Sequence, residues 1–568
     1  MKPKRFILTS FLVTSLCLCA SLAMLLIAPL VLDLTAVRAE AISRLSAWAG
    51  SNIEISGPIR ISYFPDVTFE AGRVGIRGLK RLDDVSGVTA EKLSAQLSWW
   101  YLLRGRIEID ELTLEEPRVT YRKQTREAGH PEQDSKMHNG WLDLLKRAPV
   151  TKLMIRRGKI LFRHKNNEPQ DGQDDITEID ATIDFKRNVG SASGAGQFSW
   201  RQKKLSFDFD TGEPERVATT AKVPIELNIA GALMKTSLNG ELTIADGIQI
   251  SGQQDIQISD VRGLADWVGY SIPPGPGLGN FGAVGAFSWN GAKLAFDKAS
   301  ITLDGNDATG ALSLNLEKSR PLIEGTLDFD QISLAEYFTH SESPEESRPK
   351  FRKFLDLTLL KYFDADFRIS SRKIVTDRPI AGRTAITLSV ASRVLVAEIA
   401  ETEIFGGIAS GHLELAAITS FPRLTLSGHL SNFSTAELIG SFSRVRLLRG
   451  NADLSFDLTA QGRSIEHIVR SITGQTSLKI NGDGIAMVNM KRVFSTAEAE
   501  SAVGWNNNML GETGFNQLNV SFTVKNGTIH TDDFIMKTGT RTYRGKGEIV
   551  LPANLLNWKL CRGDEAEA

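Results

Sequence analysis

Hydrophobic and polar residues alternate along most of this chain from residue 53 onward. Residues 205–209 read Leu, Ser, Phe, Asp, Phe, and the same two-residue period returns at 312–316, 454–458 and 518–524. Neighbouring side chains of a β-strand point to opposite faces, so each segment has one apolar and one polar face. Gly, Asn and Asp residues separate the segments, as turns require. The pattern predicts a mainly β protein built on a long antiparallel sheet with one dry face.

Few segments show the period of an amphipathic helix, and 141–148 and 464–472 are the better candidates. An apolar sheet face must be covered, and the predicted helices are too few to do it. We therefore expect the sheet to curl, as large twisted sheets do, into a groove with one uninterrupted apolar lining. The candidate lining residues are Leu312, Leu314, Leu316, Leu413, Leu415, Leu424, Leu426, Leu454, Phe456 and Leu458.

An internal repeat lies within this β pattern. The segments that begin at Gly310 and Gly411 share seven residues at a constant offset of 101 positions. Each copy reads as a strand, a turn marked by proline, a second strand and the start of a short helix. Ser333 and Ser434 are suited to cap the amino ends of those helices.

The first residues of the chain predict a membrane anchor. Lys2, Lys4 and Arg5 precede an uncharged, mostly apolar run that extends from residue 6 to residue 32. That length exceeds what a helix needs to cross the roughly 30 Å hydrocarbon core of a bilayer. A cleaved signal peptide is the alternative, but its apolar region usually has only about 7–15 residues. The basic amino end predicts a cytoplasmic N-terminus, with the bulk of the chain in the periplasm of a two-membrane cell.

Two polar stretches without apolar rhythm, 123–140 and 339–350, are interpreted as a loop and a linker. The expected organisation is a cytoplasmic N-terminus (1–5), a transmembrane anchor (6–34), an N-terminal β region (35–122), the polar loop (123–140), a β-groove region (141–338), the linker (339–350), a C-terminal β region (351–560) and a tail (561–568).

The charged and reactive residues suggest no catalytic chemistry. With 66 basic and 67 acidic residues the net charge is −1, which gives no general attraction for nucleic acid. The three cysteines have neither disulfide nor metal-ligand spacing. A Gly-x-Gly-x-x-Gly match at 277–282 lacks the preceding strand and following helix of a dinucleotide site. We find no convergent catalytic set. The chain is therefore predicted not to be an enzyme and to need no cofactor and no metal.

Four segments resemble the AsmA family of Gram-negative envelope proteins. They are 55–76, the Trp-Tyr-Leu-Leu-Arg-Gly run at 100–119, the Gly-Gly strand pair at 404–415, and 450–490. The resemblance implies an inner-membrane protein with a periplasmic β-groove and a role in outer-membrane biogenesis. It also implies phospholipids as partners, because larger relatives look like bridge-type phospholipid carriers. The family is not known for catalytic residues, so none carry over.

Two functions follow as hypotheses. The first is a conduit that holds or passes phospholipid tails along the groove. The second is a non-enzymatic assembly or scaffolding factor for outer-membrane proteins, whose edge strands pair with client strands. An envelope hydrolase ranks below both.

Overall fold

The protein is described from a computed structural model of the full chain. The chain divides into two compact units, one ending at Ile256 and one beginning at Gln257. The structure describes residues 43, 46, 53–62, 66–77, 85–98, 101, 104, 108–123, 150–164, 174–186, 191–212, 215–217, 220–244, 248–270, 272, 274–275, 277–317, 320–338, 357–376, 379–442, 448–491, 510–539, 541–550 and 555–562.

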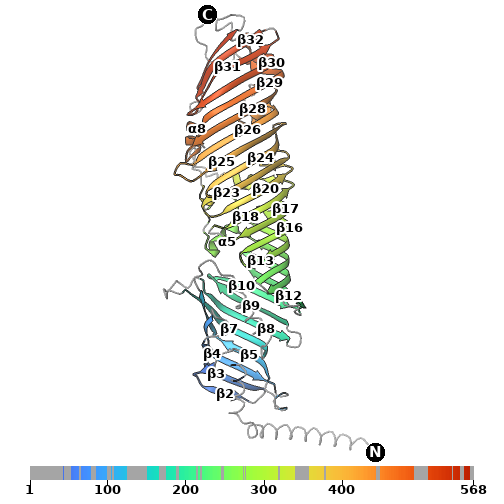
Figure 1. Ribbon diagram of the computed structural model, residues 1–568, viewed down its shortest axis with the longest axis vertical. Helices are drawn as coiled ribbons and strands as arrows, with labels where there is room; N and C mark the ends of the chain where they lie inside the picture. Colours follow the sequence, from blue (N-terminus) through green and yellow to red (C-terminus); the bar gives the residue numbers. More distant parts are fainter. Residues whose placement is uncertain are drawn as a thin grey trace, which may run out of the picture. The chain divides into compact units, whose positions relative to one another are not determined.

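The first unit is a sheet whose strands mostly follow one another in chain order (Figure 1). Its strands are β1 (Ile53–Ile55), β2 (Ile59–Ser62), β3 (Val67–Arg77), β4 (Val85–Leu97), β5 (Ile109–Glu115), β6 (Arg118–Lys123), β7 (Val150–His164), β8 (Ile176–Lys186), β9 (Ser191–Trp200), β10 (Lys203–Thr211), β11 (Glu215–Val217), β12 (Thr220–Gly231), β13 (Met234–Ile244) and β14 (Ile248–Ile258), which runs two residues past the boundary.

Pairing in this unit begins at β3, which contacts β1 and β2 along its two halves and β4 on its other edge. Strand β4 pairs with β5 and β6, and both of these lie parallel to β7. From β7 the order runs through β8, β9, β10, β12 and β13, all antiparallel, and β11 adds to β12. A hydrogen bond of 2.9 Å from Gln254 Nε2 to Thr236 Oγ1 ties β14 to β13.

The second unit is a longer series of slanted strands (Figure 1). Its elements are α5 (Val261–Val268), β15 (Phe281–Trp289), β16 (Lys293–Leu303), β17 (Asn306–Asn315), β18 (Leu322–Phe329), β19 (Ile332–Ser333), α6 (Ala335–Phe338), the 3₁₀ helix η3 (Thr358–Lys361), β20 (Asp364–Ser371), β21 (Ile374–Val375), β22 (Pro379–Ala381), β23 (Thr384–Ala391), β24 (Val394–Ile404), β25 (Gly407–Ala416), β26 (Arg423–Ser434), α7 (Thr435–Phe442), β27 (Leu448–Arg449), β28 (Asn451–Gln461), α8 (Ile465–Ser471), β29 (Thr473–Val488), β30 (Leu510–Lys525), β31 (Thr528–Thr538), β32 (Arg541–Val550) and β33 (Leu555–Arg562).

The main sheet of this unit runs β15, β16, β17, β18, β20, β23, β24, β25, β26, β28, β29, β30, β31, β32, β33. Short β27 adds to β29, and β19, β21 and β22 form a separate small sheet. The expectation of a mainly β chain with one long sheet is confirmed, and that sheet is mostly antiparallel. The expected antiparallel pairing is wrong at three pairs of the long sheet, β5–β7, β6–β7 and β18–β20, and the pair β19–β21 of the small sheet is parallel too. There the chain crosses back to the starting end before it adds the next strand, as a parallel pair requires.

Two-residue hairpins join several of the strands. Asp304 and Gly305 have φ of 50° and 75°, and Asn526 and Gly527 have φ of 48° and 75°. Two consecutive positive φ values are typical of the type I′ turn, whose twist matches that of the flanking strands. Glycine takes the second position because it reaches positive φ without steric cost. Short turns of this kind keep consecutive strands adjacent.

The short helices agree in part with the sequence. The helix predicted at 464–472 is α8, and the Ser464 side chain accepts a hydrogen bond of 3.3 Å from the His467 backbone N–H. Ser434 caps α7 in the same way, through the N–H of Glu437 at 3.3 Å. The expectation for Ser333 is wrong, because this residue ends β19 and α6 starts two residues later. Its backbone N–H bonds Asn306 instead.

Several expectations fall outside the described residues. They are the anchor at 6–34, the helix at 141–148, the linker at 339–350, and the loop at 123–140 apart from Lys123, which ends β6. No helix in the part of the chain that the structure describes is long and apolar enough to span a membrane.

Candidate functional site

The second unit has an apolar face on which side chains from successive strands form aligned rows. Register carries the first row, which we call the central row, from β16 to β28. A parallel second row, the lip row, lies nearer the turns at one end of these strands. The central row is Phe296, Leu312, Gly325, Phe367, Leu388, Ala397, Leu413, Leu426 and Leu458, and the lip row is Leu294, Leu314, Ile323, Ala365, Val390, Leu395, Leu415, Leu424 and Ala460.

Nine of the ten candidate residues lie on this face. Leu312, Leu413, Leu426 and Leu458 belong to the central row, and Leu314, Leu415 and Leu424 to the lip row. On β28, Leu454 faces Leu430, and Phe456 faces Gly428. Leu316 lies one residue past the end of β17, which ends at Asn315. Its backbone N–H bonds the Ala292 carbonyl at 2.9 Å in the turn, and its side chain is 45% exposed.

Strands β20, β23 and β24 connect the two groups of candidates, and the sequence reasoning missed them. Phe367, Leu388 and Ala397 fill the central row between Gly325 and Leu413. Their signal was present, since residues 365–369 and 386–390 alternate with the same period as the segments that were chosen. What no local pattern showed is the parallel pairing of β18 with β20, which places these strands between the two copies of the repeat.

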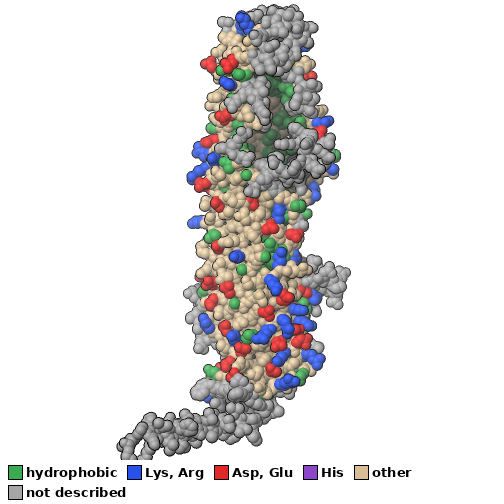
Figure 2. Space-filling model, turned by 180° about the vertical axis from the view of Figure 1, so that it is seen from behind, with side chains coloured by type: hydrophobic (Ala, Val, Ile, Leu, Met, Phe, Trp, Pro, Cys, Tyr) green, Lys and Arg blue, Asp and Glu red, His purple; other side chains and the backbone are tan. Residues whose placement is uncertain are grey.

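The candidate leucines on this face are only partly buried. Leu312, Leu413, Leu426 and Leu458 keep intermediate exposure, whereas core residues such as Phe433 and Ile480 have 0% and 1% of their surface exposed. Figure 2 shows hydrophobic side chains inside a hollow at the height of β25–β29 in Figure 1. A conventional sandwich would cover such side chains with a second layer. The described part of the chain leaves them accessible.

Two clusters interrupt the face, so the expected uninterrupted lining is wrong in these places. Leu360 of η3 packs with Ala365, Val390 and Ala417, and so covers part of the lip row. Towards the carboxyl end, a second cluster that includes Phe433, Phe515 and Met536 is fully buried. In the first unit, Val67, Phe69, Ala71, Leu93 and Leu97 form a similar closed core on β3 and β4. In the second unit, the apolar side chains that stay partly accessible are therefore those outside these two packed clusters.

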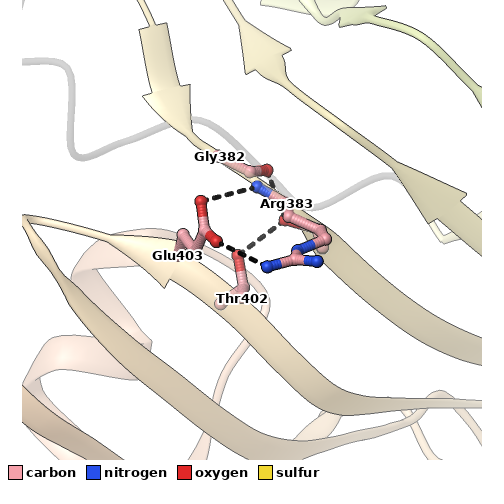
Figure 3. Close-up of polar contacts among 5 residues, drawn as sticks. Gly382, Arg383, Thr402 and Glu403 are labelled. Atoms are coloured by element: carbon pink, nitrogen blue, oxygen red, sulfur yellow. Dashed lines mark hydrogen bonds and ion pairs between the residues drawn. The ribbon is translucent and has the colours of Figure 1, made fainter.

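A polar step also crosses the face, at the strand ends opposite the lip row (Figure 3). The hydroxyls of Thr384 and Thr402 lie 2.7 Å apart, and Thr384 also donates to the carbonyl of Gly382 at 3.1 Å. Beside them Arg383 and Glu403 form an ion pair at 3.3 Å. Both threonines are buried and bonded to each other, which avoids the cost of unpaired hydroxyls in an apolar setting.

Aromatic rings lie over glycines at several points of the two faces. An added Cβ at Gly428 would lie 2.7 Å from Phe456 Cζ, and one at Gly325 would lie 2.8 Å from Phe367 Cε1. In the first unit Gly194 has the same relation to Phe209. Each ring belongs to the residue directly opposite the glycine. Pairs of this kind fill the surface above a glycine while the ring stays low on the sheet.

In the first unit, the sheet face opposite the apolar side chains is polar and charged. Lys222 pairs with Glu241 at 3.0 Å, and Lys92 pairs with Glu70 at 2.8 Å. The hydrogen bond to Glu70 raises the pKa of Lys92. The glycine motif at 277–282 proves to be a loop whose Leu278 and Gly279 N–H groups bond Asp304, and strand β15 follows it. Within the described residues no three His, Cys, Asp or Glu side chains gather as a metal site.

Together these features define a class: a protein built on a long, mostly antiparallel β-sheet, with a partly accessible apolar face in its second unit. Comparison with known proteins gives the family. The chain matches the AsmA family over residues 1–269 and 356–534, and it therefore belongs to that family. Membership indicates a protein of the cell envelope and of a generally non-enzymatic family. Neither a curated protein nor a solved structure gave a match.

Proposed function

We propose that this AsmA-family protein binds phospholipid tails on its apolar face and in this way contributes to outer-membrane biogenesis. The observation that carries the proposal is the pair of aligned rows, whose leucines are half-buried although they lie on the apolar side of a long sheet. Contiguous apolar surface that stays partly accessible is typical of ligand grooves or interfaces. In this proposal the sheet curls around the tails as an open groove.

The hydrophobic effect sets the scale of the benefit to a lipid. Each methylene withdrawn from water contributes about 0.8 kcal/mol. A two-tailed lipid of roughly 30 methylenes therefore faces a barrier on the order of 20 kcal/mol when it crosses water unaided. A row of aliphatic side chains that shields the tails removes much of this barrier, while the head group stays hydrated.

The membrane arrangement is part of the proposal. The segment 6–34, with its uncharged run at 6–32, anchors the chain in the inner membrane as a single span, with the basic amino end in the cytoplasm and the sheet in the periplasm. The family match, which begins at residue 1, supports an envelope location.

The proposal is tested with the full chain purified from membranes in mild detergent. Organic extraction and phosphate analysis measure bound phospholipid, and a fluorescent phospholipid reports transfer between vesicles. We expect bound phospholipid and transfer above the protein-free rate. A lipid-free protein that also transfers nothing would contradict the proposal.

A second candidate function rests on β33. Among the described strands, β33 pairs only with β32, so no described strand pairs with its other edge. An open edge of this kind can accept a client strand during assembly of outer-membrane proteins. Photo-crosslinkers on the outward side chains of β33 would then capture envelope proteins, whereas crosslinkers in the central row would capture lipid.

A further inference from the structure

One end of the strands β24–β28 is basic as well as apolar. At this end, register aligns Val394, Ala416, Arg423 and Gln461, each one residue beyond the lip row and of opposite parity to it. The connections that meet there are residues 391–394, 416–423 and 461–472, and we call them the basic lip. Four arginines lie in these connections, and their one carboxylate, Glu466, pairs with Arg470 at 2.8 Å.

Three of these arginines have no carboxylate partner within the described part of the chain. Arg393, Arg423 and Arg463 form no ion pair there within 4.0 Å. The Nε atom of Arg393 is buried without a hydrogen-bond acceptor. At the opposite end of neighbouring strands, by contrast, Arg383 is neutralised by Glu403. Three of the four positive charges of the basic lip are therefore not paired with a carboxylate of the described residues.

The same connections expose large apolar side chains. Ile418 is 60% exposed, Phe421 52% and Ile465 41%. The Arg463 guanidinium lies 4.9 Å from the Phe421 ring centroid, and its Nε donates to the Ser420 carbonyl. These two contacts fix the guanidinium over the ring and leave its two terminal nitrogens without a described acceptor. Guanidinium groups bind phosphate through two parallel N–H donors.

We propose that the basic lip binds the head group of an anionic phospholipid whose tails lie on the apolar face. Charge complementarity selects the occupant: uncompensated arginines suit a phosphate with net negative charge, and Leu415 and Leu424 of the adjacent lip row face each other to receive its tails. The exposed Ile418, Phe421 and Ile465 contact the upper part of the tails as they cross the lip. This inference rests on the proposed lipid-binding function and names the class of lipid.

The test uses the full chain in mild detergent, incubated with vesicles of equal parts phosphatidylglycerol and phosphatidylcholine with identical tails. Bound lipids are extracted and separated by class. Two exposed arginine contacts give a preference for phosphatidylglycerol of about fivefold. The double variant R393Q/R463Q, which changes the two unpaired arginines that lie in the connections and not on a strand, is expected to bind as much total lipid with a ratio near one. The control R383Q, at the opposite strand ends, keeps the preference.

The outcomes separate the two proposals. Bound lipid with no class preference in the wild type, or an unchanged preference in R393Q/R463Q, overturns the basic lip and leaves lipid binding intact. No bound lipid of either class overturns both. Raising the salt concentration gives an independent reading, because screening weakens the preference for the anionic lipid and leaves tail burial unaffected.

Discussion

Leu458 offers the sharpest test of the apolar face. It ends the central row on β28, where it faces Leu426 on one side and Gly474 on the other, and it is only half-buried. Replacing it with Asp removes apolar contact worth about 2 kcal/mol and adds a carboxylate that loses hydration against a lipid tail. A total near 3 kcal/mol corresponds to lipid binding weaker by about a hundredfold.

The matched control is Thr459→Asp, one residue further along β28 and on its opposite face. Thr459 faces Thr425 and Thr473, so the new carboxylate meets no like charge directly opposite. Lipid titration followed by extraction measures both variants, and thermal unfolding shows that each remains folded. L458D should lose bound lipid and T459D should keep it. If both retain wild-type occupancy, or both lose it equally, the central row does not line the binding site.

Three further changes test how the sheet is held together. Thr402→Val should lower the free energy of unfolding by about 1 kcal/mol, because the buried Thr384 hydroxyl loses its hydrogen bond to Thr402. The double variant Thr384→Val/Thr402→Val should be close to neutral in denaturant titrations. A double variant that is as destabilised as the single one would contradict this. Gly428→Ala should lower the free energy of unfolding by about 1–3 kcal/mol, because the added Cβ would clash with the Phe456 ring. Adding Phe456→Leu to this variant should restore part of the lost stability. If stability is not restored, the Phe456 ring is not what the added Cβ clashes with. Asp533 is partly desolvated, but hydrogen bonds from Ser521 and Thr531 outweigh this effect and lower its pKa. The carboxylate therefore stabilises the fold at a pH above the unfolded pKa of about 3.9, and this stabilisation disappears as the pH falls through the lower folded pKa. The stability advantage of wild type over Asp533→Asn should accordingly shrink as the pH falls below about 5 in urea unfolding, and a constant difference would refute the assignment.

The two-residue period was enough to predict which side chains share a face. Leu312, Leu314, Leu413 and Leu415 alternate with polar neighbours, and the sheet places all four on its apolar side. That inference is local, because side-chain direction in a strand depends only on parity. Helix capping is local too, so the cap at Ser434 and the helix that starts at Ser464 could be predicted from the sequence.

Features that depend on residues far apart in the sequence could not be predicted. The parallel pairing of β18 with β20 depends on the return of the chain between residues 330 and 363, which strand propensity does not specify. A bulge in β26 shifts the register between Leu430 and Phe433 and so reverses parity, with Asn432 at φ 51° and its N–H on Asp453. The exact end of a strand could not be predicted either: Leu316 has the parity of Leu314 but lies one residue past the end of β17.

Native mass spectrometry of the full chain, taken gently from membranes, tests the central claim most directly. We predict that phospholipid leaves the membrane with the protein, and that the Leu458→Asp variant carries far less of it than Thr459→Asp. Detection of the wild-type chain only without bound lipid, under conditions that preserve other protein–lipid complexes, would contradict lipid binding on the apolar face.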